Sequence, residues 1–274
     1  MLLGAHVSIA GSIANAPQRG KDMGCEAIQI FTKNQRQWKV KEMGAEEAES
    51  FKKNLSKFGI ESTVAHASYL VNLGSGKEEL YKKSLESFAE EGKRCDALGV
   101  KHLVFHPGTN EDEKEGIKNI SNALNKAIEN TKTIFLLETT AGQGSSIGYK
   151  LEHLASIMDW VEHKKRVGAC LDTCHMYSAG YDIKGNYEKV VESIEGNIGI
   201  ERVKVIHLND SKNPLGSRID RHEHIGKGSL GIESFRTLVN DKRWANLPGI
   251  LETPGGEEDY RRNLEILKGL RVEK

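Results

Sequence analysis

The chain has 274 residues, of which 38% are hydrophobic and 28% charged, and its 39 basic and 39 acidic side chains sum to a formal net charge of +0. This composition is typical of a globular protein, and no run approaches the roughly 20 apolar residues that span a bilayer, so a membrane protein is excluded. The balanced charge gives no global signal for a nucleic-acid partner. The first residues, MLLGAHVS, enter an apolar strand without the sections of a secretory signal, so we expect a cytoplasmic protein.

Eight short apolar runs recur along the chain and are typical of strands: residues 2–8, 27–32, 62–68, 102–106, 134–139, 167–172, 203–209 and 249–253. The segments between them have helical periodicity, and two of them end at a glycine suited to a helix C-terminus, Gly59 and Gly99. No linker, low-complexity tract or charge block interrupts this alternation. The pattern predicts an α/β protein with one domain over residues 1–274, folded as a (β/α)8 TIM barrel.

The strand runs are nearly continuous in hydrophobicity, as expected when both faces of a parallel sheet are covered. An open doubly wound sheet is the alternative, and it is disfavoured because no GxGxxG follows the first run. Four cysteines, Cys25, Cys95, Cys170 and Cys174, lack disulfide-like spacing and suit a reducing compartment. We interpret them as buried thiols, including the Cys170–Cys174 pair, which would need other soft ligands to bind metal.

Most of the predicted strands end in a histidine or carboxylate, which is costly to desolvate unless it is paired or bound to metal. One such residue is usually part of the architecture, but repetition at the converging strand ends of a barrel indicates a site. Nine donors exceed the three protein ligands of a mononuclear centre, so two or three ions are expected. Mixed nitrogen and oxygen donors favour zinc, with Mn²⁺ or Fe²⁺ as alternatives. The candidate ligands are His66, His106, Glu138, Asp172, His175, His207, Asp220, His222 and Glu252.

At these positions the sequence closely resembles the endonuclease IV family of apurinic/apyrimidinic (AP) endonucleases, nearly from end to end. The matching motifs are long and occur in order: GAHVS (4–8), FTKNQRQW (31–38), HASYLVNL (66–73), HPG (106–108), LETTAGQG (137–144), LDTCH (171–175), HLNDSK (207–212), DRHEHIGKG (220–228) and LETPG (251–255). The resemblance implies an enzyme, a deoxyribonuclease IV. Such enzymes hydrolyse the phosphodiester 5′ to an abasic site, leaving a 3′-hydroxyl and a 5′-deoxyribose phosphate, and trim blocked 3′ ends.

The resemblance also implies a centre of three Zn²⁺ ions. One ion would be held by His66, His106 and Glu138, and Glu138 would bridge to a second ion held by Asp172, His207 and Glu252. The third would be held by His175, Asp220 and His222. Glu138 and Glu252 are the expected catalytic carboxylates. A hydroxide between two zinc ions would be available near neutral pH to attack phosphorus, and the ions would stabilise both attacking and leaving oxygens.

Double-stranded DNA with an abasic site or a blocked 3′ end is the expected partner, and neither a membrane nor a protein partner is implied. Three zinc ions would make the metal face positive, and basic loop residues would follow the phosphates: Lys33, Arg36, Lys212, Arg218, Arg221 and Lys227. An abasic site offers no base edge, so recognition should rely on deformability, on gap-filling wedges and on flipping of the nucleotide. The expected DNA contacts are Arg36, Tyr69 and Leu70, with Asn34, Gln37, His6, Arg221 and His224.

Two other functions fit part of the pattern. A divalent-metal sugar isomerase or epimerase also places acidic and histidine ligands on barrel strand ends, but it would need neither the trio His175, Asp220 and His222 nor the NQRQW loop. A DNA-damage-binding protein without catalysis is the second alternative, against which the intact ligand set argues.

Overall fold

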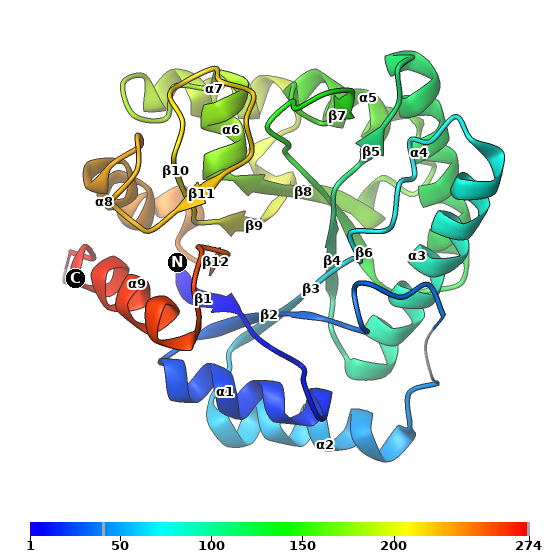
Figure 1. The fold of residues 1–274 in the computed structure, drawn as a ribbon, viewed down its shortest axis with the longest axis horizontal. Coiled ribbons are helices and arrows are strands. Elements are labelled where there is room, and N and C mark those ends of the chain that lie inside the picture. The colour runs from blue at the N-terminus through cyan, green and yellow to red at the C-terminus, as the bar shows by residue number, and fades with distance from the viewer. Residues whose placement is uncertain (40–41, 273–274) are drawn as a thin grey trace.

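The computed structural model describes residues 1–39 and 42–272, so the last two residues of the expected domain lie outside it. Eight parallel strands close into a barrel in the order β1-β12-β9-β8-β6-β4-β3-β2 (Figure 1), which confirms the TIM-barrel prediction. The predicted strand starts match within one residue, while several predicted ends run one or two residues too far. The barrel strands are β1 (Leu2–His6), β2 (Ala27–Phe31), β3 (Ser62–His66), β4 (His102–Phe105), β6 (Ile134–Glu138), β8 (Val167–Asp172), β9 (Val203–His207) and β12 (Pro248–Leu251).

Helices surround the barrel, as Figure 1 shows. Gly59 and Gly99 end two of them in the left-handed conformation, as the sequence predicts. Two helices in succession, α6 and α7, follow β8. The helices are α1 (Ala16–Met23), α2 (Ala45–Phe58), α3 (Glu78–Leu98), α4 (Glu113–Glu129), α5 (Leu151–Trp160), α6 (Thr173–Ala179), α7 (Tyr187–Asn197), α8 (Ile232–Asn240) and α9 (Glu257–Gly269).

Two small antiparallel sheets, which the sequence did not predict, lie in the loops that follow the strands. One pairs β5 (Gly108–Thr109) with β7 (Ser146–Ile147), and the other pairs β10 (Asp210–Ser211) with β11 (His222–Glu223). Each sheet ties together two segments that leave the barrel at the same end. The loops that carry several candidate ligands are therefore held by backbone hydrogen bonds.

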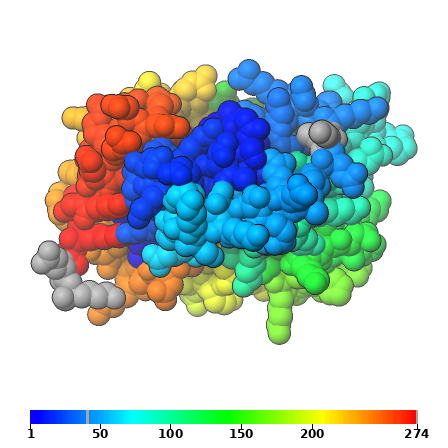
Figure 2. Space-filling model, turned by 90° about the horizontal axis from the view of Figure 1, so that it is seen from below, coloured from blue at the N-terminus to red at the C-terminus, as the bar shows by residue number. Residues whose placement is uncertain are grey.

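The first and last segments of the chain lie side by side. Helix α9 packs beside β1, and Arg271, just beyond it, donates a 2.6 Å hydrogen bond to the carbonyl of Met1. Figure 2 shows this flank, with N-terminal segments in blue shades next to α9 in red. Among the described residues, no helix combines the length and the apolarity required to cross a bilayer.

The barrel interior is filled by one layer of apolar side chains. Seven strands each contribute one fully buried residue to this cluster: Ala27, Val64, Val104, Leu136, Cys170, Val205 and Ile250. The eighth strand contributes Gly4, whose register partners are Ala27 and Ile250. A Cβ atom on Gly4 would come within 1.7 Å of the Ala27 carbonyl oxygen, so this position has no space for a side chain. Cys170 is thus a buried packing residue, as expected.

Candidate metal centre and nucleic-acid interface

A ring of polar side chains lies directly above the apolar layer of the barrel. Side chains alternate between the two faces of a strand, so the residue two positions beyond each interior residue also points inward. Applied to Gly4 and the seven apolar residues, this spacing selects one polar residue per strand: His6, Gln29, His66, His106, Glu138, Asp172, His207 and Glu252. The register pairs His6 with Gln29 and Asp172 with His207, whereas other neighbours are staggered by two residues, as His66 lies opposite Val104. The polar ring therefore follows from strand periodicity and the closed barrel.

All nine predicted ligands come together in three groups whose ligand atoms lie within 4.8 Å of one another. These groups are His66 with His106 and Glu138; Glu138 with Asp172, His207 and Glu252; and His175 with Asp220 and His222. The division is the one that the family resemblance implies. A fourth group joins Asp172 and His222 to Cys174, a thiol that was expected to be structural. Burial raises the pKa of the Cys174 thiol to about 12.

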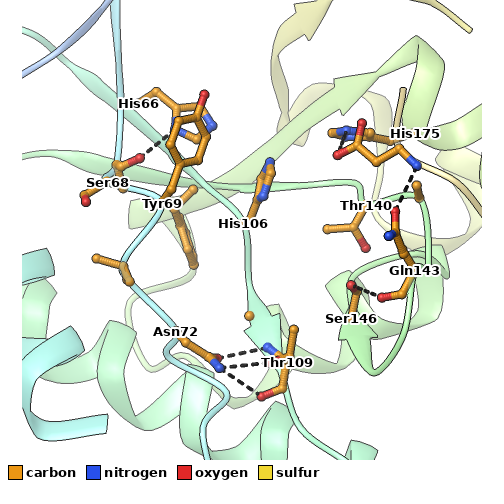
Figure 3. A pocket seen from close by; sticks show the side chains of 16 residues that line it. His66, Ser68, Tyr69, Asn72, His106, Thr109, Thr140, Gln143, Ser146 and His175 are labelled. Atoms are coloured by element: carbon orange, nitrogen blue, oxygen red, sulfur yellow. Dashed lines mark hydrogen bonds and ion pairs between the residues drawn. The ribbon is translucent and has the colours of Figure 1, made fainter. Parts of the chain in front are cut away.

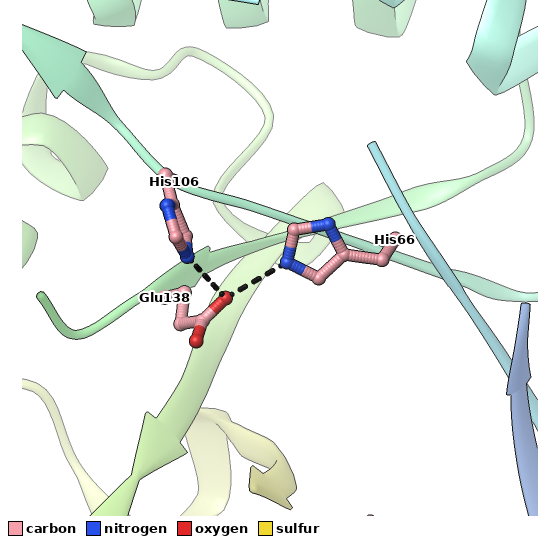
Figure 4. Close-up of side chains that lie close together, drawn as sticks. All are labelled: His66, His106 and Glu138. Atoms are coloured by element: carbon pink, nitrogen blue, oxygen red, sulfur yellow. Dashed lines mark hydrogen bonds and ion pairs between the residues drawn. The ribbon is translucent and has the colours of Figure 1, made fainter. Parts of the chain in front are cut away.

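Glu138 lies at the centre of the first two groups and is fully buried. Its Oε2 atom is 3.0 Å from His66 Nε2 and 3.2 Å from His106 Nε2 (Figure 4). Its Oε1 atom is 3.0 Å from His207 Nδ1 and 3.3 Å from His175 Nδ1. Each carboxylate oxygen thus faces a different set of imidazoles, which is the arrangement that a bridging carboxylate requires.

The second group adds two carboxylates around His207. The Nδ1 atom of this imidazole lies 3.2 Å from Glu252 Oε2 and 3.8 Å from Asp172 Oδ2. Both carboxylates are anchored by other contacts. Asp172 Oδ2 accepts a 2.7 Å bond from Asn209 Nδ2, and Glu252 Oε1 accepts a 2.6 Å bond from Gln29 Nε2. Glu252 therefore faces the imidazole with the oxygen that Gln29 does not bind, whereas Asp172 faces it with the oxygen that Asn209 holds.

The third group depends on local structure beyond the strands. Asp172 is the N-cap of α6, and its Oδ1 atom accepts a 2.8 Å bond from the backbone N–H of His175. This cap places His175 Nε2 at 3.2 Å from Asp220 Oδ2. His222, on β11, brings its Nε2 to 3.4 Å from both His175 Nε2 and Asp220 Oδ1. A helix cap and a two-stranded sheet thus complete this group.

Four of the five candidate imidazoles face hydrogen-bond acceptors on both ring nitrogens. The first nitrogen donates to an anchoring oxygen: His66 Nδ1 to Ala67 O, His175 Nδ1 to Thr139 O, His222 Nδ1 to Glu252 O and His207 Nε2 to Gln29 Oε1. The second nitrogen of each faces a carboxylate of the cluster. A neutral imidazole carries only one N–H, so the second nitrogen needs an added proton or a metal cation. An anchored outer nitrogen and a converging inner one are typical of metal-binding histidines.

The carboxylates determine the protonation of the cluster. Burial alone would lower the pKa of His175, but Asp172 and Asp220 outweigh it and raise that pKa well above the ordinary range. The pKa values of His66 and His207 are also raised against the effect of burial, with Glu138 contributing at both. Burial alone would raise the pKa of Glu138, yet the imidazoles, His207 foremost, hold it well below its usual value. Glu138 is therefore ionised and attracts cations.

Two buried amides in the site were missed by the sequence analysis. Gln29 accepts from His207 through Oε1 at 2.8 Å and donates to Glu252 through Nε2. Asn209 donates to Asp172 and accepts the backbone N–H of Glu252 at 2.8 Å. The available signal was the position of Gln29, a polar residue inside the apolar run AIQIF. For Asn209 the only signal in the sequence was its position two residues after His207, a predicted ligand at the end of a strand.

A cleft of about 460 Å³ opens beside the cluster (Figure 3). Its lining includes His66, His106, His175 and Asp220, with Tyr69 beside His66 (Figure 3) and residues of the loops after β4 and β6, among them Thr109 and Gln143. Anionic groups that enter this cleft reach the first and third groups directly.

The loops that carry the expected DNA contacts lie near this cleft with differing exposure. Asn34, Arg36 and Gln37 are exposed, and Asn34 Oδ1 accepts the backbone N–H of Arg36 at 2.9 Å. Tyr69 is 65% exposed, with its ring 6.0 Å from that of His66, while Leu70 is half-buried. These side chains are available for contact with a large substrate.

The remaining expected DNA contacts are more enclosed, apart from the exposed Arg221. His6 lies in the polar ring, 3.5 Å from Glu252, and within residues 1–39 and 42–272 its buried Nε2 atom has no hydrogen-bond partner. His224 accepts a 3.1 Å bond from Asn263 on α9. The expectation that Lys33 follows phosphates is wrong, because its side chain is 1% exposed and lies 3.6 Å from Glu91.

Comparison with known proteins agrees with this geometry. The family described as xylose isomerase-like TIM barrel matches residues 17–270. A protein of Chloroflexus aurantiacus named probable endonuclease 4 is 44% identical over 276 residues, and the match covers 97% of each chain. The crystal structure of endonuclease IV from Thermus thermophilus superimposes with a TM-score of 0.90 at 36% identity, covering 98% of both chains.

Sugar-converting enzymes resemble this chain in fold alone. A D-tagatose 3-epimerase-like protein covers 98% of this chain and 97% of its own, with a TM-score of 0.73 at 20% identity. The much higher similarity to endonuclease IV, both in sequence and in structure, supports the family that the motifs predict. The chain therefore belongs to the endonuclease IV family of deoxyribonucleases, built on a xylose isomerase-like TIM barrel.

Proposed function

We propose that this protein hydrolyses the DNA phosphodiester on the 5′ side of an abasic site, and trims blocked 3′ ends, with a centre of three zinc ions. One observation carries the proposal. In three adjoining groups, imidazoles such as those of His66, His175 and His222 donate from one ring nitrogen to a backbone oxygen and face a carboxylate with the other. Such an arrangement leaves lone pairs converging on shared positions. Together with membership of the endonuclease IV family, it supports a polynuclear metal hydrolase.

The donor set fits zinc better than magnesium or calcium, which prefer oxygen-only shells. The first ion would be held by His66, His106 and Glu138, the second by Glu138, Asp172, His207 and Glu252, and the third by His175, Asp220 and His222. When bound, such a centre supplies a bridging hydroxide near neutral pH and positive charge for in-line displacement at phosphorus. Five neutral imidazoles and four carboxylates suit three dications, because an excess positive charge remains for the phosphate.

The protein's own groups position the reaction. Glu138 connects two metal positions through separate oxygens, and Gln29 holds Glu252 and His207 in fixed orientation. Burial of these residues excludes bulk water, so their charges act in a medium of low dielectric constant. Fixed dipoles and charges stabilise a developing charge at phosphorus without reorganising during the reaction.

Selection of an abasic site is assigned to the two exposed loops beside the cleft. Arg36 and Tyr69 are solvent-accessible and can enter the gap left by a missing base, with Leu70 behind them. The 460 Å³ cleft receives the sugar and phosphate of the displaced nucleotide.

A sugar isomerase or epimerase is the runner-up function, and it shares the barrel. The group formed by His175, Asp220 and His222 argues against it, because a small sugar does not need this additional metal position. Exposed Arg36 and Gln37, next to the cleft, are likewise suited to a polymer rather than to an enclosed small substrate.

The test is cleavage of an end-labelled duplex that contains one abasic site, with the matched intact duplex as control. We expect a single cut 5′ to the abasic position, leaving an end that a DNA polymerase extends, and elemental analysis should give three zinc ions per chain. Cleavage of both duplexes at equal rates, or a protein that isolates without metal and gains no activity from zinc, would contradict the proposal.

A further inference from the structure

A buried ion pair lies beneath the two loops that flank the cleft. Lys33, in the loop after β2, and Glu91, on α3, have side chains 1% and 0% exposed and lie 3.6 Å apart between Nζ and Oε1. Neither belongs to the metal cluster, and of the two only Lys33 was expected, as a basic loop residue, to contact DNA. The pair is therefore a charged element of the fold that neither metal binding nor the exposed surface explains.

The pair connects the Arg36 loop (residues 32–39) to the Tyr69 loop (residues 67–70). Lys33 Nζ donates to the carbonyl of Gln37 at 3.2 Å and to Ser87 Oγ, on α3, at 2.6 Å. The carboxylate of Glu91 accepts the backbone N–H of Ser68 at 3.1 Å. One side of the ion pair thus holds the Arg36 loop, and the other side holds the Tyr69 loop.

A direct contact closes the connection between these loops. Ser68 Oγ donates a 2.7 Å bond to the carbonyl of Gln35 and accepts a longer one from the backbone N–H of Leu70. The ring of Phe31, at the end of β2, packs edge-on against Tyr69 with centroids 5.5 Å apart. Arg36 and Tyr69 are consequently carried on two loops with a common buried support.

Stability alone is a poor reason for this arrangement. Desolvation of two charges offsets much of their attraction, and apolar replacements of a buried pair are often neutral or stabilising. The distinctive property of the ion pair is that its carboxylate and its ammonium group each orient several hydrogen bonds at once. Resting on the function proposed above, we infer that Lys33 and Glu91 are positioning residues that set the separation of the Arg36 and Tyr69 loops for abasic-site recognition.

The experiment compares wild-type protein with Lys33→Met, Glu91→Gln and the double variant K33M/E91L, all loaded with zinc. The dissociation constant for an abasic duplex should rise by about tenfold or more in each variant, equivalent to about 1.4 kcal/mol. Zinc content and hydrolysis of the small diester bis(4-nitrophenyl) phosphate should change less than about twofold, because the cluster is untouched. The double variant should melt at or above the wild-type temperature and still bind abasic DNA weakly.

Glu26→Gln provides a matched control at the opposite end of the barrel. Glu26 pairs with Arg271 and accepts the backbone N–H of Leu3 at 2.8 Å, as Glu91 accepts that of Ser68. It should change stability without changing the preference for abasic DNA. Variants of Lys33 and Glu91 that keep wild-type affinity for abasic duplex, or lose zinc and diester hydrolysis in parallel with it, would overturn the inference. A wild-type protein that does not distinguish abasic from intact duplex would instead overturn the proposed function, and this inference with it.

Discussion

Removal of the metal ions should destabilise the protein in a strongly pH-dependent way. Without metal, the pKa values of His66, His175 and His207 lie above the ordinary 6.5, because neighbouring carboxylates, and at His207 first the Cys170 side chain, outweigh the effect of burial. A group with a raised folded-state pKa contributes stability that is complete below its unfolded pKa and is lost as pH rises toward the folded value. The protons on these imidazoles therefore take the place of the cations at pH 6.5 and below, and they do so less well as pH rises.

The magnitude follows from the number of protons that the folded state holds in excess. These imidazoles share the same carboxylates and do not titrate independently, so one to three extra protons above pH 6.5 correspond to about 1.4–4 kcal/mol of unfolding free energy per pH unit. For a chain of this size each kcal/mol shifts Tm by about 2–4 °C, so the metal-free Tm should fall by roughly 3–16 °C from pH 6.5 to 7.5. Metal binds only the deprotonated imidazoles, so the metal-loaded protein gains stability over the same interval.

The assay is thermal unfolding of zinc-loaded and chelator-treated protein at pH 6.5, 7.0 and 7.5. The difference in Tm between the two forms should widen with pH, since titration elsewhere in the chain cancels in this difference. Asp220→Asn is the companion variant, because Asp220 helps to raise the pKa of His175, and its metal-free form should show a shallower pH dependence. A metal-free Tm that is constant over this pH range would refute the assigned pairing of protons and carboxylates.

Three further predictions concern the bridging carboxylate Glu138, the buried amide Gln29 and the packing at Gly4. Glu138→Gln keeps the shape of the side chain but cannot bridge two cations, so kcat on abasic duplex should fall at least about a thousandfold and zinc stoichiometry should drop on elemental analysis. Gln29→Leu removes the amide that holds His207 and Glu252, and titration with a zinc indicator should show metal affinity weakened by about 10–100-fold, with loss of less than tenfold counting against the role of the amide. Gly4→Ala places a methyl group against the Ala27 carbonyl and should lower Tm by roughly 6 °C or more, at about 3 kcal/mol of overpacking, whereas Gly196→Ala, which meets nothing within 4 Å, should leave Tm unchanged or slightly raised.

The sequence allowed the barrel and its ligands to be predicted because both depend on periodicity. Parallel strands buried on both faces produce continuous apolar runs, and ligands at the ends of such runs are conspicuous. His66 and Glu138 were recognisable for this reason. The small sheets β5–β7 and β10–β11 were not predicted, since strands of two residues carry no periodic signal, and β5–β7 forms only where the barrel brings the loops after β4 and β6 together.

Lys33 shows why charge in a loop is an ambiguous signal. Its neighbours Asn34 and Arg36 are exposed, and nothing in the local sequence distinguishes the one basic residue that turns inward. The partner that explains its burial, Glu91, lies 58 positions further along the chain, on the buried side of α3. The role of Gln29 was missed for a related reason. Its partners His207 and Glu252 come at the ends of β9 and β12, and only the closed barrel brings them within hydrogen-bond distance of Gln29 on β2.

The same closure explains how a site with so many ionisable groups is compatible with a stable fold. The polar ring lies next to the apolar layer, so five of its eight members are buried, while His6, His106 and Glu252 are partly exposed. Each ring carboxylate has an imidazole or an amide of the chain as partner, as Glu138 has His66 and Glu252 has Gln29. An unpaired buried charge would oppose folding, whereas a paired one opposes it far less. The imidazoles and amides therefore offset much of the cost of burying the ring carboxylates, and metal binding would exchange the imidazole protons for cations.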